Sequence, residues 1–139
     1  TCCHASTSAL SNMIKKDDWK TLEIPTQFET FFLERTLTKK DLAYIKEGQR
    51  PEEMEDKWFM YCENNKLFIH RSWTGYCIYI VELSDNGKLK TIVNRDPQQY
   101  KETDIEQDKL QLYILINRLV KQNEENARLM KLFFERRKS

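Results

Sequence analysis

Glycine is scarce in this chain, which has only three glycines among its 139 residues. Gly48, Gly75 and Gly87 lie too far apart to form a glycine-rich phosphate loop, so the folds that hold nucleotides by such a loop are excluded. No serine stands in a GxSxG pattern, and Ser72 beside His70 gives little support to nucleophilic catalysis. A ligand site must therefore be built from other side chains.

An excess of charge is also missing. The chain has 23 lysine and arginine residues against 22 acidic residues, which gives a formal net charge of +1. Binding to nucleic acid or to an anionic membrane surface relies on a basic excess, so neither partner is expected. Any contact with a charged ligand has to be local.

Long apolar runs are absent as well. The longest run, residues 76–81, is far shorter than the roughly 20 residues that a membrane helix needs. No apolar core of a signal peptide opens the chain. We expect a cytoplasmic protein that does not contact a membrane.

Cysteine and histidine do not combine into a metal pattern. The four cysteines form no CxxC pair, and His4 and His70 are the only histidines, which is poor ligand spacing for zinc. Cys62 and Cys77 lie inside strand-like runs and suit small buried apolar positions. We expect no metal and no other cofactor.

The length and the 40% hydrophobic content suit one domain with one core. Residues 1–17 are expected to be a flexible tail or linker; the first dozen are either a linker from a longer protein or a non-native remnant, with Met13 a candidate native start. Residues 18–122 are expected to form a single α+β domain, and residues 123–139 a helical extension.

A period of two from Lys57 to Asn94 predicts an antiparallel sheet of about four strands. Asn64-Asn65 tolerates the positive φ of a two-residue hairpin, and residues 84–87 are a second turn signal. The third strand, residues 76–83, is apolar on both faces and is predicted to be central. The simplest topology is a meander. Residues 19–33 are expected to form an extended arm whose aromatics lie on the core.

Two helices have sequence signals at their ends. Thr38 as N-cap, Asp41 three residues later and Gly48 as terminator predict a short helix over residues 39–47. Thr103 with Glu106 predicts the start of a longer, largely covered helix. That helix either continues, bent, to about residue 137 or breaks near residues 122–126, and we favour the break. Asp96-Pro97 can open a separate helical turn.

The candidate site follows from topology. In an antiparallel meander the start of the first strand, the 73–75 turn and the end of the fourth strand share one end of the sheet. This end collects most of the titratable side chains of the sheet region: Glu53, Glu55, Asp56, Lys57, His70, Arg71, Trp73, Asn94, Arg95 and Asp96.

The residue types at this end suit an anion or nucleotide pocket. Arginine presents paired donors to phosphate or carboxylate, tryptophan stacks on a base, and histidine titrates near neutrality. The candidate catalytic residues are Glu55, Asp56 and His70. The candidate ligand-binding residues are Arg71, Trp73, Thr74, Arg95 and Asp96.

A structural interpretation competes with this one. Glu55 or Asp56 paired with Arg71 or Arg95 would close the end of the sheet as a salt-bridge network. Strand alternation also puts His70 and Arg71 on opposite faces unless a bulge intervenes.

Three strings carry a resemblance: Met-Glu-Asp-Lys-Trp-Phe at 54–59, His-Arg-Ser-Trp-Thr-Gly at 70–75 and Asn-Arg-Asp-Pro-Gln-Gln-Tyr at 94–100. They resemble a group of short, uncharacterised, mostly bacterial domains, over residues 18–120. The group has no assigned activity. Its association with ADP-ribose and nucleotide-processing proteins implies a nucleotide-related role.

The sequence thus predicts a small α+β domain that binds an anionic or nucleotide-like ligand at the 70–75 turn, with hydrolysis of that ligand left open. The alternative is a non-enzymatic interaction module. In it the C-terminal helix forms a homodimer or docks on a partner protein, and the charged rim is structural.

Overall fold

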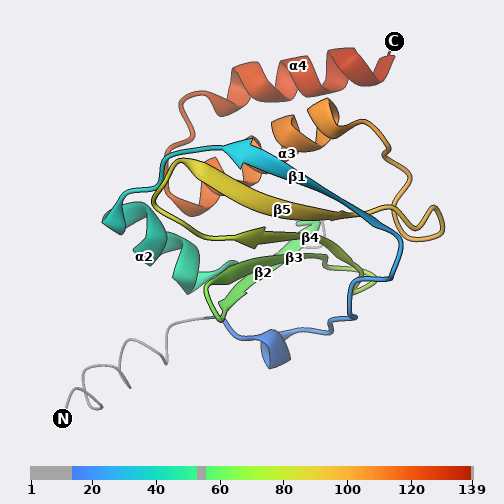
Figure 1. Cartoon of the computed structure of the whole chain (residues 1–139), viewed down its shortest axis with the longest axis horizontal. Coiled ribbons are helices and arrows are strands. Elements are labelled where there is room, and N and C mark those ends of the chain that lie inside the picture. Colours follow the sequence, from blue (N-terminus) through green and yellow to red (C-terminus); the bar gives the residue numbers. More distant parts are fainter. Residues whose placement is uncertain (1–13, 53–55, 139) are drawn as a thin grey trace.

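The computed structural model describes residues 14–52 and 56–138, and it has an α+β architecture with one five-stranded antiparallel sheet (Figure 1). The elements in chain order are η1 (Lys16–Asp18), β1 (Phe28–Glu34), α2 (Lys39–Glu47), β2 (Trp58–Glu63), β3 (Lys66–Arg71), β4 (Cys77–Glu82), β5 (Lys88–Asn94), α3 (Ile105–Leu119) and α4 (Asn126–Lys138). The α+β class predicted from the sequence is confirmed.

The sheet has the strand order β1-β5-β4-β3-β2. Strands β2 to β5 form the predicted meander with β4 at the centre, but the expected number of about four strands was one too few. The fifth strand, β1, comes from the extended arm and pairs with β5, with Phe31 opposite Thr91. This pairing joins segments some 60 residues apart, which short-range patterns do not reveal.

Local signals explain the elements that were predicted most accurately. The Thr38 hydroxyl accepts a hydrogen bond from the Asp41 backbone N–H, and the Asp41 carboxylate accepts one from the Thr38 backbone N–H. Helix α2 ends before Gly48, which has a φ of 75°. Asn64 and Asn65 have φ values of 53° and 61°, as a two-residue hairpin requires. Both predictions are confirmed, because each depends on a few neighbouring residues.

One of the predicted turn and helix starts was wrong. The N-cap of α3 is Asp104, whose side chain accepts from the Glu106 backbone, and not Thr103. Asp96-Pro97 opens a single turn, as predicted: the Asp96 carbonyl accepts from the backbone N–H of Gln99 and of Tyr100, and the Asp96 side chain caps the turn by accepting from the Gln98 backbone. At the start of α3 an aspartate carboxylate one residue after the expected cap satisfies the backbone donor.

The core lies between one face of the sheet and α3. Leu112, Ile116 and Leu119 of α3 pack in one cluster with sheet residues that include Tyr79 and Val81. The other face carries Phe59, Tyr61 and His70 and is crossed by the N-terminal arm, where Trp19 stacks on Phe59 with ring centroids 6.2 Å apart.

The two C-terminal helices are separate, as favoured from the sequence. Helix α3 ends at Leu119 and α4 begins at Asn126, and α4 lies on the outer side of α3 (Figure 1). Gln107 donates to the Phe133 carbonyl at 2.8 Å, and Asn117 donates to Asn126 at 3.0 Å. No helix in the described ranges combines the length and the apolarity that a membrane crossing requires.

Candidate functional site

The turn after β3 fixes the side chains at one end of the sheet. The backbone N–H of Gly75 donates to the Arg71 carbonyl, and that of Ser72 donates to the Lys57 carbonyl, which ties the turn to the start of β2. Gly75 has a φ of 82°, and a Cβ there would lie 3.2 Å from the Lys20 carbonyl oxygen. The turn therefore requires glycine both for its backbone conformation and for the close approach of the arm.

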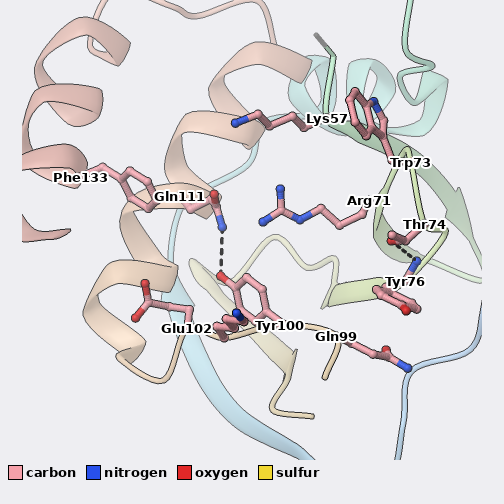
Figure 2. Close-up of a pocket in the computed structure, with 11 residues that line it drawn as sticks. Lys57, Arg71, Trp73, Thr74, Tyr76, Gln99, Tyr100, Glu102, Gln111 and Phe133 are labelled. Atoms are coloured by element: carbon pink, nitrogen blue, oxygen red, sulfur yellow. Dashed lines mark hydrogen bonds between the residues drawn. The ribbon is translucent and has the colours of Figure 1, made fainter. Parts of the chain in front are cut away.

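A cavity of about 750 Å³ opens beside this turn (Figure 2). Its walls come from the β2 start and the turn after β3 (Lys57, Arg71, Trp73, Thr74, Tyr76), from the loop before α3 (Gln99, Tyr100, Lys101, Glu102) and from the two C-terminal helices (Gln111, Phe133). Three of these residues are basic and one is acidic. The acidic one, Glu102, uses its carboxylate to accept from the backbone N–H groups of Thr103 and Asp104.

Arg71 occupies the middle of this cavity (Figure 2). Its guanidinium lies 4.5 Å from the ring centroid of Trp58, a cation–π contact that holds the side chain in place. Within residues 14–52 and 56–138, no carboxylate or other acceptor pairs with that guanidinium, or with the ammonium group of Lys57. The cavity thus presents two positive groups whose hydrogen-bond donors face open space.

A second cavity of about 440 Å³ adjoins the first and shares Lys57, Arg71, Gln111 and Phe133 with it. Arg118 adds a further positive group, and Met130 and Phe134 of α4 add apolar surface. The two cavities together form a groove between the sheet end and the C-terminal helices, and the shared basic residues stand at its centre.

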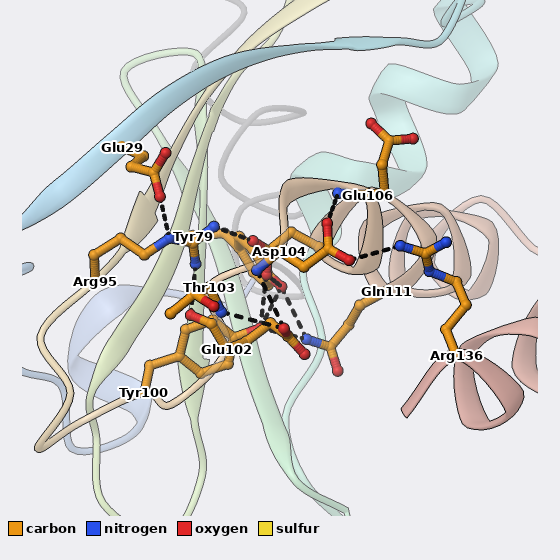
Figure 3. Close-up of polar contacts among 11 residues, drawn as sticks. Glu29, Tyr79, Arg95, Tyr100, Glu102, Thr103, Asp104, Glu106, Gln111 and Arg136 are labelled. Atoms are coloured by element: carbon orange, nitrogen blue, oxygen red, sulfur yellow. Dashed lines mark hydrogen bonds and ion pairs between the residues drawn. The ribbon is translucent and has the colours of Figure 1, made fainter. Parts of the chain in front are cut away.

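Arg95 is at the same end of the sheet but does not line either cavity. Its guanidinium binds Glu29 Oε1 at 2.5 Å and Asp108 Oδ2 at 2.6 Å, and it donates to the Glu102 carbonyl at 2.9 Å (Figure 3). The Asp108 side chain is fully buried. Arg95 therefore compensates a buried carboxylate, which is the structural interpretation, although with partners other than the expected Glu55 or Asp56.

Asp108 also anchors two phenols. Tyr79 and Tyr100 each place a hydroxyl 2.8 Å from Asp108 Oδ1, and Gln111 Nε2 donates to both hydroxyls at 2.9 and 3.1 Å. Burial raises the pKa of Asp108, whereas the hydrogen bonds from Arg95, Tyr100 and Tyr79 lower it. This network supports the cavity from behind, because Tyr100 and Gln111 belong to both.

His70 lies on the opposite face of the sheet from Arg71. Its Nδ1 is 3.0 Å from the Gly75 carbonyl oxygen and its ring stacks on Tyr61, with Phe59 also adjacent. Burial lowers the pKa of His70, and its Nε2 is buried without a hydrogen-bond partner among the described residues. The structure does not bring His70 to the cavity.

The other candidates divide between the cavity and its surroundings. Trp73 and Thr74 line the larger cavity, and Asp56 lines the smaller one. Asp96 serves its own turn, where Oδ1 accepts from the Gln98 backbone at 3.0 Å. Glu55, like Glu53, lies outside the described residues.

Sequence reasoning missed seven of the residues that line the larger cavity: Tyr76, Gln99, Tyr100, Lys101, Glu102, Gln111 and Phe133. Gln99 and Tyr100 belong to the string at 94–100, which was a usable signal, but Gln111 and Phe133 reach the site only through the packing of α3 and α4. Among the described residues, no group of three or more His, Cys, Asp or Glu side chains lies close enough together to hold a metal ion.

Comparison with known proteins adds no relative: no protein-family model, no curated protein and no solved structure matches this chain.

Proposed function

We propose that the cavity beside the turn after β3 binds a small anionic ligand with a planar group, of the kind that a nucleotide provides. The observation that carries the proposal is Arg71, held on Trp58 in the middle of the cavity with no acceptor among the described residues. A guanidinium in such a position offers up to five donors to phosphate or carboxylate oxygens.

Size and wall composition support the same class of ligand. Small-molecule sites commonly enclose about 300 to 1,000 Å³, with apolar and aromatic walls and a few polar groups. The cavity of about 750 Å³ has this composition, with Trp73, Tyr76 and Tyr100 around Arg71. Trp73 is 66% exposed, so a planar group can reach its ring.

The proposal covers binding and not hydrolysis. Of the three candidate catalytic residues, His70 faces away from the cavity, Glu55 is outside the described residues and Asp56 lines only the smaller cavity. The Asp56 carboxylate accepts from the Glu52 backbone at 2.9 Å. This arrangement gives no support to a general base that would activate a water molecule for hydrolysis.

Calorimetric titration with AMP, ADP, NAD, ADP-ribose and pyrophosphate tests the proposal. We expect at least one of these to bind, and Arg71→Met to weaken it about 10- to 100-fold, because a charge-assisted hydrogen bond contributes about 1.5 to 3 kcal/mol. Arg71→Lys should retain part of the affinity, since it keeps the charge and loses the planar fork.

Lysine provides the matched control. Lys57→Met should weaken binding, whereas Lys90→Met, a change at an exposed lysine on β5 away from the cavity, should not. If no ligand in the panel binds at millimolar concentration, or if both lysine variants lose affinity equally, the cavity is not the proposed site.

The surface of α4 favours a second function, a homodimer or a protein-interaction module. Phe134 is 52% exposed and Leu132 is 37% exposed, which is more apolar surface than a solvated helix needs. If α4 mediates association, light scattering should give the mass of a dimer, and Leu132→Ser with Phe134→Ser should give a folded monomer. A monomeric mass for the unmodified chain at high concentration would remove this function.

A further inference from the structure

The orientation of the Gln111 amide is fixed by groups behind the cavity. Its Nε2 donates toward the Tyr79 hydroxyl at 2.9 Å and the Tyr100 hydroxyl at 3.1 Å, two oxygens that lie together, 2.8 Å apart, on one side of the amide. In Figure 2 the amide nitrogen points to Tyr100 and the oxygen is on the other side of the amide. No described residue donates to that oxygen, Gln111 Oε1, in the structure.

The proton inventory of the network supports this orientation. Asp108 is paired with Arg95 and accepts from the phenols, so the phenol protons are directed at its Oδ1 and their lone pairs are left for Gln111. A flipped amide would place Oε1 against the same two oxygens. One phenol would then have to stop donating to a buried carboxylate, which leaves that carboxylate less satisfied.

Gln111 Oε1 is therefore an acceptor of fixed orientation in a cavity that also contains groups able only to donate. Arg71 and Lys57 carry positive donors, and both line the cavity with Gln111. A bare anion satisfies these two residues but offers nothing to Gln111 Oε1. A ligand that carries a hydroxyl near its anionic group satisfies all three.

We infer that Gln111 is a specificity-determining residue, held by Tyr79, Tyr100 and Asp108, which selects ligands that carry a sugar hydroxyl as well as the phosphate. This inference rests on the proposed function, since it concerns the same cavity. It names the ligand class more narrowly, as sugar phosphates rather than anions in general. Sites that hydrogen-bond a hydroxyl discriminate against the analogue that lacks it, because the site group is left unpaired.

The test compares AMP with 2′,3′-dideoxy-AMP, which keeps the base and the phosphate and loses both ribose hydroxyls. We expect the unmodified protein to bind AMP about tenfold more tightly, as one lost hydrogen bond implies. Gln111→Met should bring the ratio close to one by weakening AMP and leaving the dideoxy analogue unchanged. Gln98→Met, a change at an exposed glutamine outside the cavity, should keep the tenfold ratio.

A second variant keeps the test decisive if Gln111→Met does not fold. Tyr79 lies behind the cavity and does not line it, and Tyr79→Phe removes one of the two acceptors that hold the amide. It should reduce the AMP preference while the dideoxy analogue binds as before. A purely structural role would instead change the melting temperature and leave the ratio intact.

The outcomes separate this inference from the proposed function. Equal affinity of the unmodified protein for the two nucleotides, or a ratio that survives both variants, overturns the inference while an Arg71-dependent affinity still supports the site. If neither nucleotide binds the unmodified protein at millimolar concentration, the nucleotide-binding proposal fails and the inference fails with it.

Discussion

Two arginines at the same end of the sheet have opposite surroundings. Arg95 is bound by Glu29 and by the buried Asp108, and its Nη1 donates to the Glu102 carbonyl. Arg71 lies in a cavity, packed on Trp58, without a carboxylate partner among the described residues. Both were candidate ligand-binding residues in the sequence, and only their partners distinguish them.

The comparison teaches where a positive charge contributes to folding and where it is available for a ligand. A charge that neutralises a buried carboxylate is needed for stability, because its removal leaves the carboxylate without a counterion in a low-dielectric environment. A half-exposed charge with no acceptor adds little to stability and retains its donors for a ligand. Mutation of Arg95 should therefore lower the free energy of unfolding, whereas mutation of Arg71 should lower the affinity for a ligand.

The largest expected effect is on stability at Arg95. Arg95→Met should reduce the free energy of unfolding by about 3 to 5 kcal/mol, because Asp108 would be left buried without its counterion. Chemical denaturation measures the loss. A reduction below about 1 kcal/mol would mean that Arg95 is as dispensable for folding as Arg71 and would end the contrast.

The same site offers a rescue experiment. Asp108→Asn combined with Arg95→Met removes the stranded charge, so the double variant should lose less than the sum of the two single changes. Strict additivity would indicate that the two side chains do not act as a pair.

A smaller effect is expected at His70, the buried polar neighbour of Arg71 on β3. Burial lowers its pKa in the folded state, so protonation favours the unfolded chain. Stability should be flat above about pH 6.5, the usual value for histidine, and should fall as the pH drops below it, by at most about 1.4 kcal/mol per pH unit. His70→Gln should flatten this slope in urea denaturation measured between pH 7.5 and 5.5. An unchanged slope would show that His70 is not the group responsible.

The smallest expected effect is on stability at Arg71. Arg71→Met should change the free energy of unfolding by less than about 1 kcal/mol, since the cation–π contact with Trp58 is the main interaction that its guanidinium loses. Denaturation under the conditions used for Arg95→Met gives the direct comparison. A loss of 3 kcal/mol or more would assign Arg71 to the structural class and weaken the ligand proposal.

Short-range chemistry explains what the sequence predicted well. The helix over residues 39–47 and the Asn64-Asn65 hairpin depend on caps and on positive φ values within a few residues. The shared sheet end of Arg71 and Arg95 followed from strand connectivity. These features need no knowledge of the packing between distant segments.

The missed features all depend on such packing. Strand β1 pairs with β5 across a long stretch of chain, and Asp108 reads in the sequence as an ordinary acidic residue of a first helical turn. Because Asp108 is buried against Tyr79 and Tyr100, Arg95 is needed as its counterion and has a structural role. No local pattern distinguishes this aspartate from a solvent-exposed one.

The N-terminal arm has a consequence for any shortened form of this chain. Trp19 donates its indole N–H to the Ser72 carbonyl at 2.7 Å, and the Leu22 backbone donates to the Gly75 carbonyl at 2.8 Å. The arm is thus hydrogen-bonded to both ends of the turn that carries Trp73. A shortened chain that starts at β1 would keep every residue that lines the cavity but would lose the hydrogen bonds that hold the turn in place. The shortest chain that preserves the site therefore begins before Trp19.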